Sequence, residues 1–135
     1  MTMSELRVVH PSDRDCGTSQ TPGMSREEGV GAATVGAEAL WSGHVTVAAG
    51  VKSGPHHHGA SESAIYVISG RARMRWGDHL ENVVEAGPGD FIYVPAFLVH
   101  QEINASEDED VAMIVSRSSP ENITVNLDIP EGKEA

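Results

Sequence analysis

The sequence is poor in cysteine and in positive charge, and each shortage excludes a class of protein. Cys16 is the one cysteine among 135 residues. It cannot form an internal disulfide, and no second cysteine offers a zinc-ribbon spacing, so a reducing cytoplasm is the expected location. Nine basic residues stand against 20 acidic ones, which gives a formal net charge of −11. Because such a field repels phosphate backbones, the composition argues against nucleic-acid binding.

Long hydrophobic runs are also missing. No apolar segment approaches membrane-spanning length, and the first 15 residues have neither the hydrophobic block nor the charge layout of a signal peptide. The sequence therefore predicts no membrane association. The apolar content of 39% and the length of 135 residues fit one globular domain with a modest core.

From residue 31 onward, short β-rich runs alternate with Gly and Pro turns, and no stretch has a convincing helical period. This pattern predicts an all-β fold, an antiparallel sandwich or barrel, over residues 31–128. Residues 1–30 are expected to form a partly flexible N-terminal arm, and residues 129–135 a C-terminal tail. The expected strands lie at 39–51, 64–70, 71–76, 91–95, 111–115 and 123–127.

Two of these runs show which face each side chain should take. In residues 71–76, alternation predicts that Ala72, Met74 and Trp76 point inward and that three arginines form a basic outer face. That face is interpreted as solvated or paired with acidic groups, with a contact to a substrate carboxylate as the alternative. In residues 123–127 the inward side chains are expected to be Ile123, Val125 and Leu127.

The stretch PHHHG at residues 55–59 contains three of the seven histidines. In an extended segment His56 and His58 point to one side and His57 to the other, so the first two form a chelating pair. Such a pair alone leaves two interpretations open, a metal site or a polar turn. His100, which begins another short extended run, favours the metal site.

Two spaced motifs around these histidines resemble those of the cupin family. The first consists of Gly50, His56, His58, Glu62 and Gly70, and the second of Gly89, Pro95, Phe97, His100 and Asn104. The resemblance implies a jelly-roll barrel that holds one mononuclear metal ion, with His56, His58, Glu62 and His100 as ligands. Such ligands suit a divalent transition metal, so iron, manganese, nickel, cobalt, copper and zinc all remain open.

The chain departs from the family pattern at two positions. An ungapped alignment places the usual glutamate column on Ser63, with Glu62 one residue early. Glu62 is nevertheless expected to point inward, because it shares parity with the apolar face of residues 72–76 if Gly70 adds no bulge. Otherwise the site would consist of three histidines with water or with another side chain. Phe97 stands where the family often has glycine, which indicates a changed turn.

The resemblance implies a metal-dependent enzyme that acts on a small organic molecule, as a dioxygenase, an isomerase or a polyketide cyclase. Glu62 is the candidate catalytic base, with a metal-bound hydroxide as the alternative. Gln101 is expected to point outward because of its parity. The alternative is a non-catalytic cupin that binds a metal or a small molecule, or acts as a sensor. A homodimer is also expected, because residues 4–10 could add a strand to an exposed sheet edge of a second copy.

Overall fold

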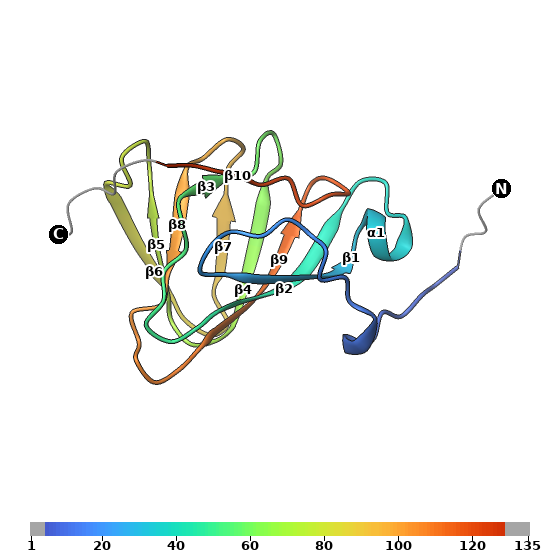
Figure 1. The fold of residues 1–135 in the computed structure, drawn as a ribbon, viewed down its shortest axis with the longest axis horizontal. Coiled ribbons are helices and arrows are strands. Elements are labelled where there is room, and N and C mark those ends of the chain that lie inside the picture. Colours follow the sequence, from blue (N-terminus) through green and yellow to red (C-terminus); the bar gives the residue numbers. More distant parts are fainter. Residues whose placement is uncertain (1–4, 129–135) are drawn as a thin grey trace.

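Two five-stranded antiparallel sheets face each other in the computed structural model, which describes residues 5–128 (Figure 1). We name them sheet A and sheet B. In spatial order, sheet A consists of β1 (Ser25–Val30), β2 (Trp41–Val47), β9 (Val111–Arg117), β4 (Ser63–Ser69) and β7 (Phe91–Val94). Sheet B consists of β10 (Val125–Asn126), β3 (His56–His57), β8 (His100–Ile103), β5 (Ala72–Trp76) and β6 (Asn82–Ala86). The all-β prediction is confirmed.

Helical structure is confined to two short pieces outside the sheets. They are the 3-10 turn η1 (Pro11–Asp13) and the helix α1 (Ala32–Val35). In residues 5–128, therefore, neither helix has the length or the apolar character needed to cross a membrane.

Sheet A supplies most of the apolar core. Its three central strands, β2, β9 and β4, have seven residues each, and β2 pairs with β9 without interruption from Trp41 opposite Arg117 to Val47 opposite Val111. Alternate side chains on these strands are buried, as period-two patterning requires. The core side chains that they contribute are Trp41, Val45, Val47, Ile65, Val67, Val111, Met113 and Val115.

Gly43 makes room for the largest of these side chains. It lies on the inner face of β2, two residues after Trp41. A Cβ atom at this position would collide with the indole ring of Trp41 and with the carbonyl oxygen of Glu27 on β1. The absence of a side chain therefore allows Trp41 to lie flat over its own strand with no exposed surface.

Sheet B places polar side chains on much of its inner face. Only Ala72, Met74 and Ala86 extend the apolar core into this sheet. Met74 of β5 lies directly opposite Glu102 of β8, so this glutamate faces the interior beside a core methionine. β3 and β10 have only two residues each, so few backbone hydrogen bonds connect them to their neighbours in sheet B.

Three expectations about side-chain burial are wrong. Trp76 lies on the same face as Met74, but β5 ends at Trp76, and this residue is 37% exposed. Arg75, expected on a solvated face, is buried, because the turn that carries Leu80 covers it and accepts a hydrogen bond from its Nε at 2.9 Å. The expected inward strand at 123–127 shortens to β10, where Ile123 and Val125 are each 40% exposed.

The N-terminal segment contributes more structure than its composition indicates. Residues 25–30 form β1, which pairs with β2 and extends sheet A into the expected arm. Residues 6–9, which have an apolar run, form no strand. The strand β6 was not among the predicted runs either. Polar residues in β1 and at the start of β6 concealed both edge strands, which are held by backbone pairing to their neighbours.

Candidate metal centre

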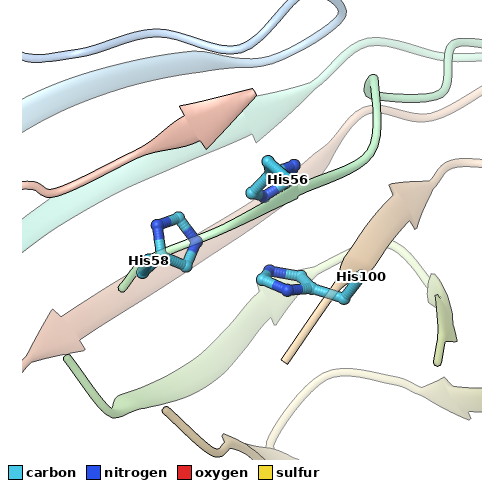
Figure 2. A group of neighbouring side chains, drawn as sticks. All are labelled: His56, His58 and His100. Carbon is cyan, nitrogen blue, oxygen red and sulfur yellow. The ribbon is translucent and has the colours of Figure 1, made fainter. Parts of the chain in front are cut away.

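Sheet B brings three histidines together inside the barrel. β3 lies beside β8 with His56 opposite His100, and His58 follows β3 directly. The ligand atoms of these three residues lie within 4.8 Å of one another, and the three side chains are at most 3% exposed. Figure 2 shows His56 and His58 on one segment and His100 on the strand beside it. The cluster could hold a metal ion.

Backbone carbonyls fix which nitrogen of each ring is available. The Nδ1 atoms of His56, His58 and His100 lie 2.8, 2.8 and 2.9 Å from the carbonyl oxygens of Gly54, Ile123 and Leu98. A carbonyl oxygen only accepts, so each Nδ1 carries the proton and donates it. In a neutral imidazole the lone pair is then on Nε2, the atom that would bind a metal.

Burial keeps at least one of these rings neutral. The pKa of His58 is lowered to about 2, chiefly because the ring is removed from water and also because the Arg117 guanidinium lies nearby. At neutral pH His58 therefore presents a lone pair rather than a second N–H. Metal binding requires this state, since a protonated ring cannot be a ligand.

Glu102 joins the histidines from the same strand as His100. Its Oε2 lies 3.2 Å from Nε2 of His56, and its Oε1 lies 3.3 Å from Nε2 of His100. Burial alone would raise the pKa of this carboxyl, but its contacts with the two imidazoles hold that pKa well below its ordinary value. Glu102 was not among the ligands predicted from the sequence. The signal was available, since His100 and Glu102 are two residues apart in a strand and share a face, as His56 and His58 do.

The expectation that Glu62 points inward is wrong. Glu62 is exposed, and its Oε1 accepts a 2.5 Å hydrogen bond from the hydroxyl of Tyr93 on the outer face of sheet A. Parity fails at the turn after β4, where Gly70 has φ 80° and the β4–β9 register shifts between Val67 and Ser69. The inner residues of β4 are consequently the odd-numbered ones, whereas those of β5 are even-numbered.

Ser63 takes the inner position next to Glu62, and a buried arginine occupies the space beside it. The Nη1 of Arg117 donates to the Ser63 hydroxyl, and its Nε donates to Oδ1 of Asn122 at 2.7 Å. The guanidinium also lies over the ring of Trp41, 5.5 Å from its centroid. The Arg117 guanidinium therefore lies beside the inner face of β4, at the position where the family resemblance implied a carboxylate ligand.

His57, Phe97 and Gln101, which lie near the histidine ligands in the sequence, are outside the cluster. His57 points away from it, and its Nδ1 accepts a hydrogen bond from the Gly59 N–H at 3.0 Å. Phe97 has φ 61°, in the left-handed region where glycine has no steric cost, so the turn keeps a glycine-like backbone although a ring stands there. Gln101 was expected to point outward but is fully buried, because the segment at Ser53 covers it and accepts a hydrogen bond from its Nε2 at 2.8 Å.

The fold and the cluster together define a small two-sheet β-barrel with a buried group of three histidines that could bind a metal. The model of the cupin domain family matches residues 43–116, more than half of the chain, and the protein belongs to that family. This span contains most of β2, all of β3 to β8 and most of β9, and with them every histidine of the cluster. No curated protein matches the chain.

Solved structures with the same fold include a polyketide cyclase and two enzymes of oxalate chemistry. RemF, the polyketide cyclase from Streptomyces resistomycificus, is 19% identical over 94% of this chain and 89% of its own, with a TM-score of 0.72. Oxalate decarboxylase OxdC from Bacillus subtilis is 22% identical over 82% of this chain, with a TM-score of 0.70, and an oxalate oxidase is 22% identical over 84%, with a TM-score of 0.65. The matched region spans 29% and 60% of those two chains. At such identities the likeness establishes the fold.

Proposed function

We propose that this protein is a metal-dependent cupin that acts on a small organic molecule. The observation that carries the proposal is the convergence of three buried imidazoles, each with Nδ1 held by a backbone carbonyl and Nε2 directed into the cluster. Three separate carbonyls fix the same tautomer in His56, His58 and His100. Core packing alone does not require this arrangement.

The donor set fits a divalent transition metal. Imidazole nitrogens suit iron, manganese, nickel, cobalt, copper and zinc, whereas calcium and magnesium prefer oxygen ligands. His56, His58 and His100 would hold the ion through Nε2. When bound, such an ion supplies Lewis-acid polarisation of a substrate oxygen or, if it is redox-active, a site for dioxygen chemistry. The Bacillus subtilis oxalate decarboxylase, which shares the fold, has Mn(II) centers.

Two buried arginines favour a substrate with anionic oxygens. Arg26 on β1 is 1% exposed and Arg117 on β9 is 5% exposed, and neither forms an ion pair with a carboxylate within the described residues. The Nε of Arg26 has no hydrogen-bond partner in the same range. Buried guanidinium groups are costly unless an anion approaches them. The buried Glu102 carboxylate partly offsets this cost for both arginines. A carboxylate or enolate bound beside the histidines would supply further negative charge.

The reaction belongs, on this proposal, to dioxygenase, isomerase or polyketide-cyclase chemistry. The structural relatives support a small oxygen-rich substrate, since one is a polyketide cyclase and others are named for oxalate. A second function, non-catalytic binding of a metal or small ligand, is favoured by one observation. The predicted base, Glu62, lies on the outer face, hydrogen-bonded to Tyr93.

The first experiment is elemental analysis of the untagged protein after chelation and reconstitution with each candidate metal. We expect about one equivalent of a transition metal per chain. The loaded protein is then incubated with 1,2-dicarbonyl, catechol and polyketide-like substrates, with oxygen uptake and product formation as readouts. Metal binding with turnover supports the enzyme, and metal binding without turnover supports the binder. Failure to bind any metal would refute both forms of the proposal.

Assembly into a homodimer is a further part of this proposal. The segment at residues 6–9 is exposed or partly exposed and forms no strand, so its backbone could pair with the edge of a second copy. β1 and β7 are the edge strands of sheet A. A solution mass of twice 14.3 kDa supports the dimer, and a mass of 14.3 kDa would refute it. The cytoplasmic location stays a prediction.

A further inference from the structure

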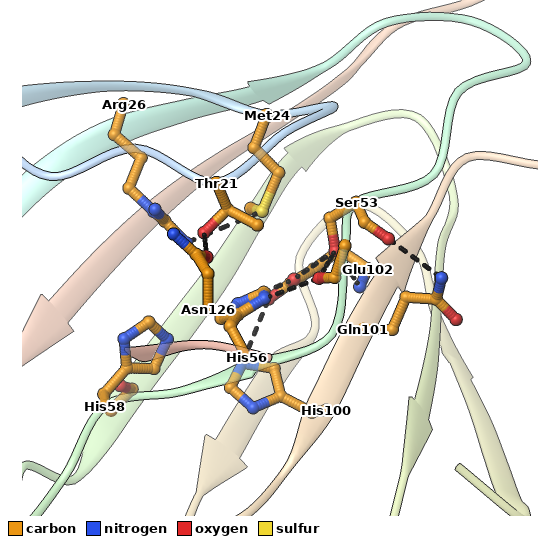
Figure 3. A network of polar contacts seen from close by, with 12 residues as sticks. Thr21, Met24, Arg26, Ser53, His56, His58, His100, Gln101, Glu102 and Asn126 are labelled. Carbon is orange, nitrogen blue, oxygen red and sulfur yellow. Dashed lines mark hydrogen bonds and ion pairs between the residues drawn. The ribbon is translucent and has the colours of Figure 1, made fainter. Parts of the chain in front are cut away.

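We propose that Glu102 is the fourth protein ligand of the metal centre and supplies its carboxylate from β8, on the opposite sheet from β4. This inference rests on the proposed function, since it presupposes that the three histidines bind a metal. It assigns a ligand role to a residue that is not one of the defining positions of either sequence motif. Figure 3 shows Glu102 beside Ser53 and close to the rings of His56 and His100.

The distances match those between neighbouring ligands of one ion. Metal bonds to nitrogen and carboxylate oxygen are about 2.1 Å long, so two ligands at angles between an octahedral and a tetrahedral value are about 3.0–3.4 Å apart. Glu102 satisfies this spacing twice, through Oε2 at 3.2 Å from His56 Nε2 and Oε1 at 3.3 Å from His100 Nε2. The two oxygens of one carboxylate thus each approach a nitrogen that faces the cluster.

The contact between Glu102 and His56 lacks the alignment of a hydrogen bond. The Nε2 of His56 has no hydrogen-bond partner in residues 5–128, although Oε2 of Glu102 is 3.2 Å away. With Nδ1 donating to Gly54, Nε2 of a neutral ring presents a lone pair to the carboxylate. Two lone pairs at this distance repel unless a positive charge lies between them, which is a proton on the imidazole in the metal-free protein or a metal ion in the loaded one. A metal ion at the common centre supplies that charge and uses both lone pairs.

Ser53 and the β8 backbone hold Glu102 in this orientation. The N–H of Glu102 donates to Ser53 Oγ at 3.0 Å, and the N–H of Ser53 donates to the Glu102 carbonyl at 2.8 Å. The Ser53 hydroxyl also lies 3.3 Å from Oε2 of the carboxylate. These bonds to Ser53 on one side, and the pairing of Glu102 with Met74 of β5 on the other, limit the freedom of this residue. Such preorganisation is typical of a metal ligand.

The test compares metal affinity in four proteins: the wild type, Glu102→Gln, Glu62→Gln and His100→Ala. Zinc affinity is measured by competition with a chromophoric chelator, and the absorption spectrum of the cobalt-loaded protein reports the ligand set. Glu102→Gln keeps the size of the side chain and an acceptor for Ser53 but removes the negative charge. Glu62→Gln makes the same change on the outer face and is the matched control.

We expect Glu102→Gln to lower zinc affinity at least about tenfold and to change the cobalt spectrum, while Glu62→Gln stays within about twofold of the wild type. Wild-type affinity and an unchanged spectrum in Glu102→Gln would overturn the inference. His100→Ala separates the two proposals: if it alone loses the metal, the histidine centre stands and the role of Glu102 is wrong. If His100→Ala also binds like the wild type, the metal centre itself is wrong.

A second variant guards against misfolding. Should Glu102→Gln not fold, Glu102→Asp retains the charge on a shorter side chain. We expect it to fold and to bind zinc with an affinity lowered by several-fold, together with a changed cobalt spectrum. Wild-type zinc affinity and an unchanged spectrum in Glu102→Asp would overturn the inference in the same way.

Discussion

Sheet A and sheet B share one interior but contribute different chemistry to it. The central strands of sheet A are seven residues long and bury Val, Ile, Met and Trp side chains. Sheet B has two strands of only two residues, and its inner face carries the three histidines and Glu102. The apolar sheet therefore contributes most of the apolar core, and the polar sheet contributes the groups that could hold a metal.

This difference shows how a small barrel can bury four polar side chains. Each imidazole in sheet B has its Nδ1 satisfied by a backbone carbonyl, so burial leaves only the Nε2 side to be compensated. Burying the Nε2 side of each ring costs free energy. The apolar side chains that sheet A buries offset this cost. Stability and site should then respond separately to substitution in the two sheets.

The largest effect is expected for His100→Ala in sheet B. Structural zinc sites bind with about 10–16 kcal/mol. If the site has the four proposed ligands, loss of one should weaken binding by roughly 4 kcal/mol, about a thousandfold. Metal affinity of His100→Ala is measured by chelator competition beside His10→Ala, which removes an exposed histidine far from the cluster in sequence. Equal affinities in the two variants would contradict the role of sheet B.

In sheet A, Met113→Ala should lower the free energy of unfolding by about 2–5 kcal/mol, because Met113 is fully buried at the centre of β9. Urea denaturation of the metal-free protein measures the change. Metal affinity of the folded variant should stay within about threefold of the wild type. As a control, Ile68→Ala removes a side chain that is 43% exposed on β4, and it should cost less. A large loss of metal affinity in Met113→Ala would show that the sheets do not act separately.

Acid should weaken the metal-free protein through the buried histidines of the cluster. The pKa of His58 is about 2 in the folded state, against about 6.5 in an unfolded chain, so only the unfolded state binds a proton there between these values. Stability is therefore lost as pH falls below about 6.5, by about 1.4 kcal/mol per pH unit for this residue. Urea titrations at pH 7, 6 and 5 should give a steeper decline for the wild type than for His58→Gln. Parallel declines would show that the pKa of His58 is not lowered.

The smallest effect is expected for Tyr93→Phe on the outer face of sheet A. Tyr93 is 64% exposed, and its hydroxyl donates to the exposed Glu62. Loss of this bond should change the free energy of unfolding by no more than about 0.5 kcal/mol and leave metal affinity unaltered. Thermal unfolding and chelator competition check both values. A measurable loss of metal would indicate that the Glu62 side of β4 does reach the site.

The sequence alone determined the fold class and the three histidines. Period-two runs separated by Gly and Pro turns indicate short strands, and the spacing of His56, His58 and His100 agrees with the cupin motifs. Both signals are local or depend on fixed spacing, so they can be recognised in the sequence without knowledge of the packing. The sequence did not predict β1 and β6, because these edge strands are held by backbone pairing with a neighbouring strand and have no clear apolar pattern.

The tertiary structure decided which carboxylate faces the cluster. Parity assigned Glu62 to the interior only if the chain crossed Gly70 without a register change, and the turn there reverses the parity. Glu102 faces His56 and His100 because β8 lies between β3 and β5, an adjacency that depends on residues far apart in the sequence. Side-chain alternation is a local property of a strand, but the faces that meet inside a barrel are set by which strands pair.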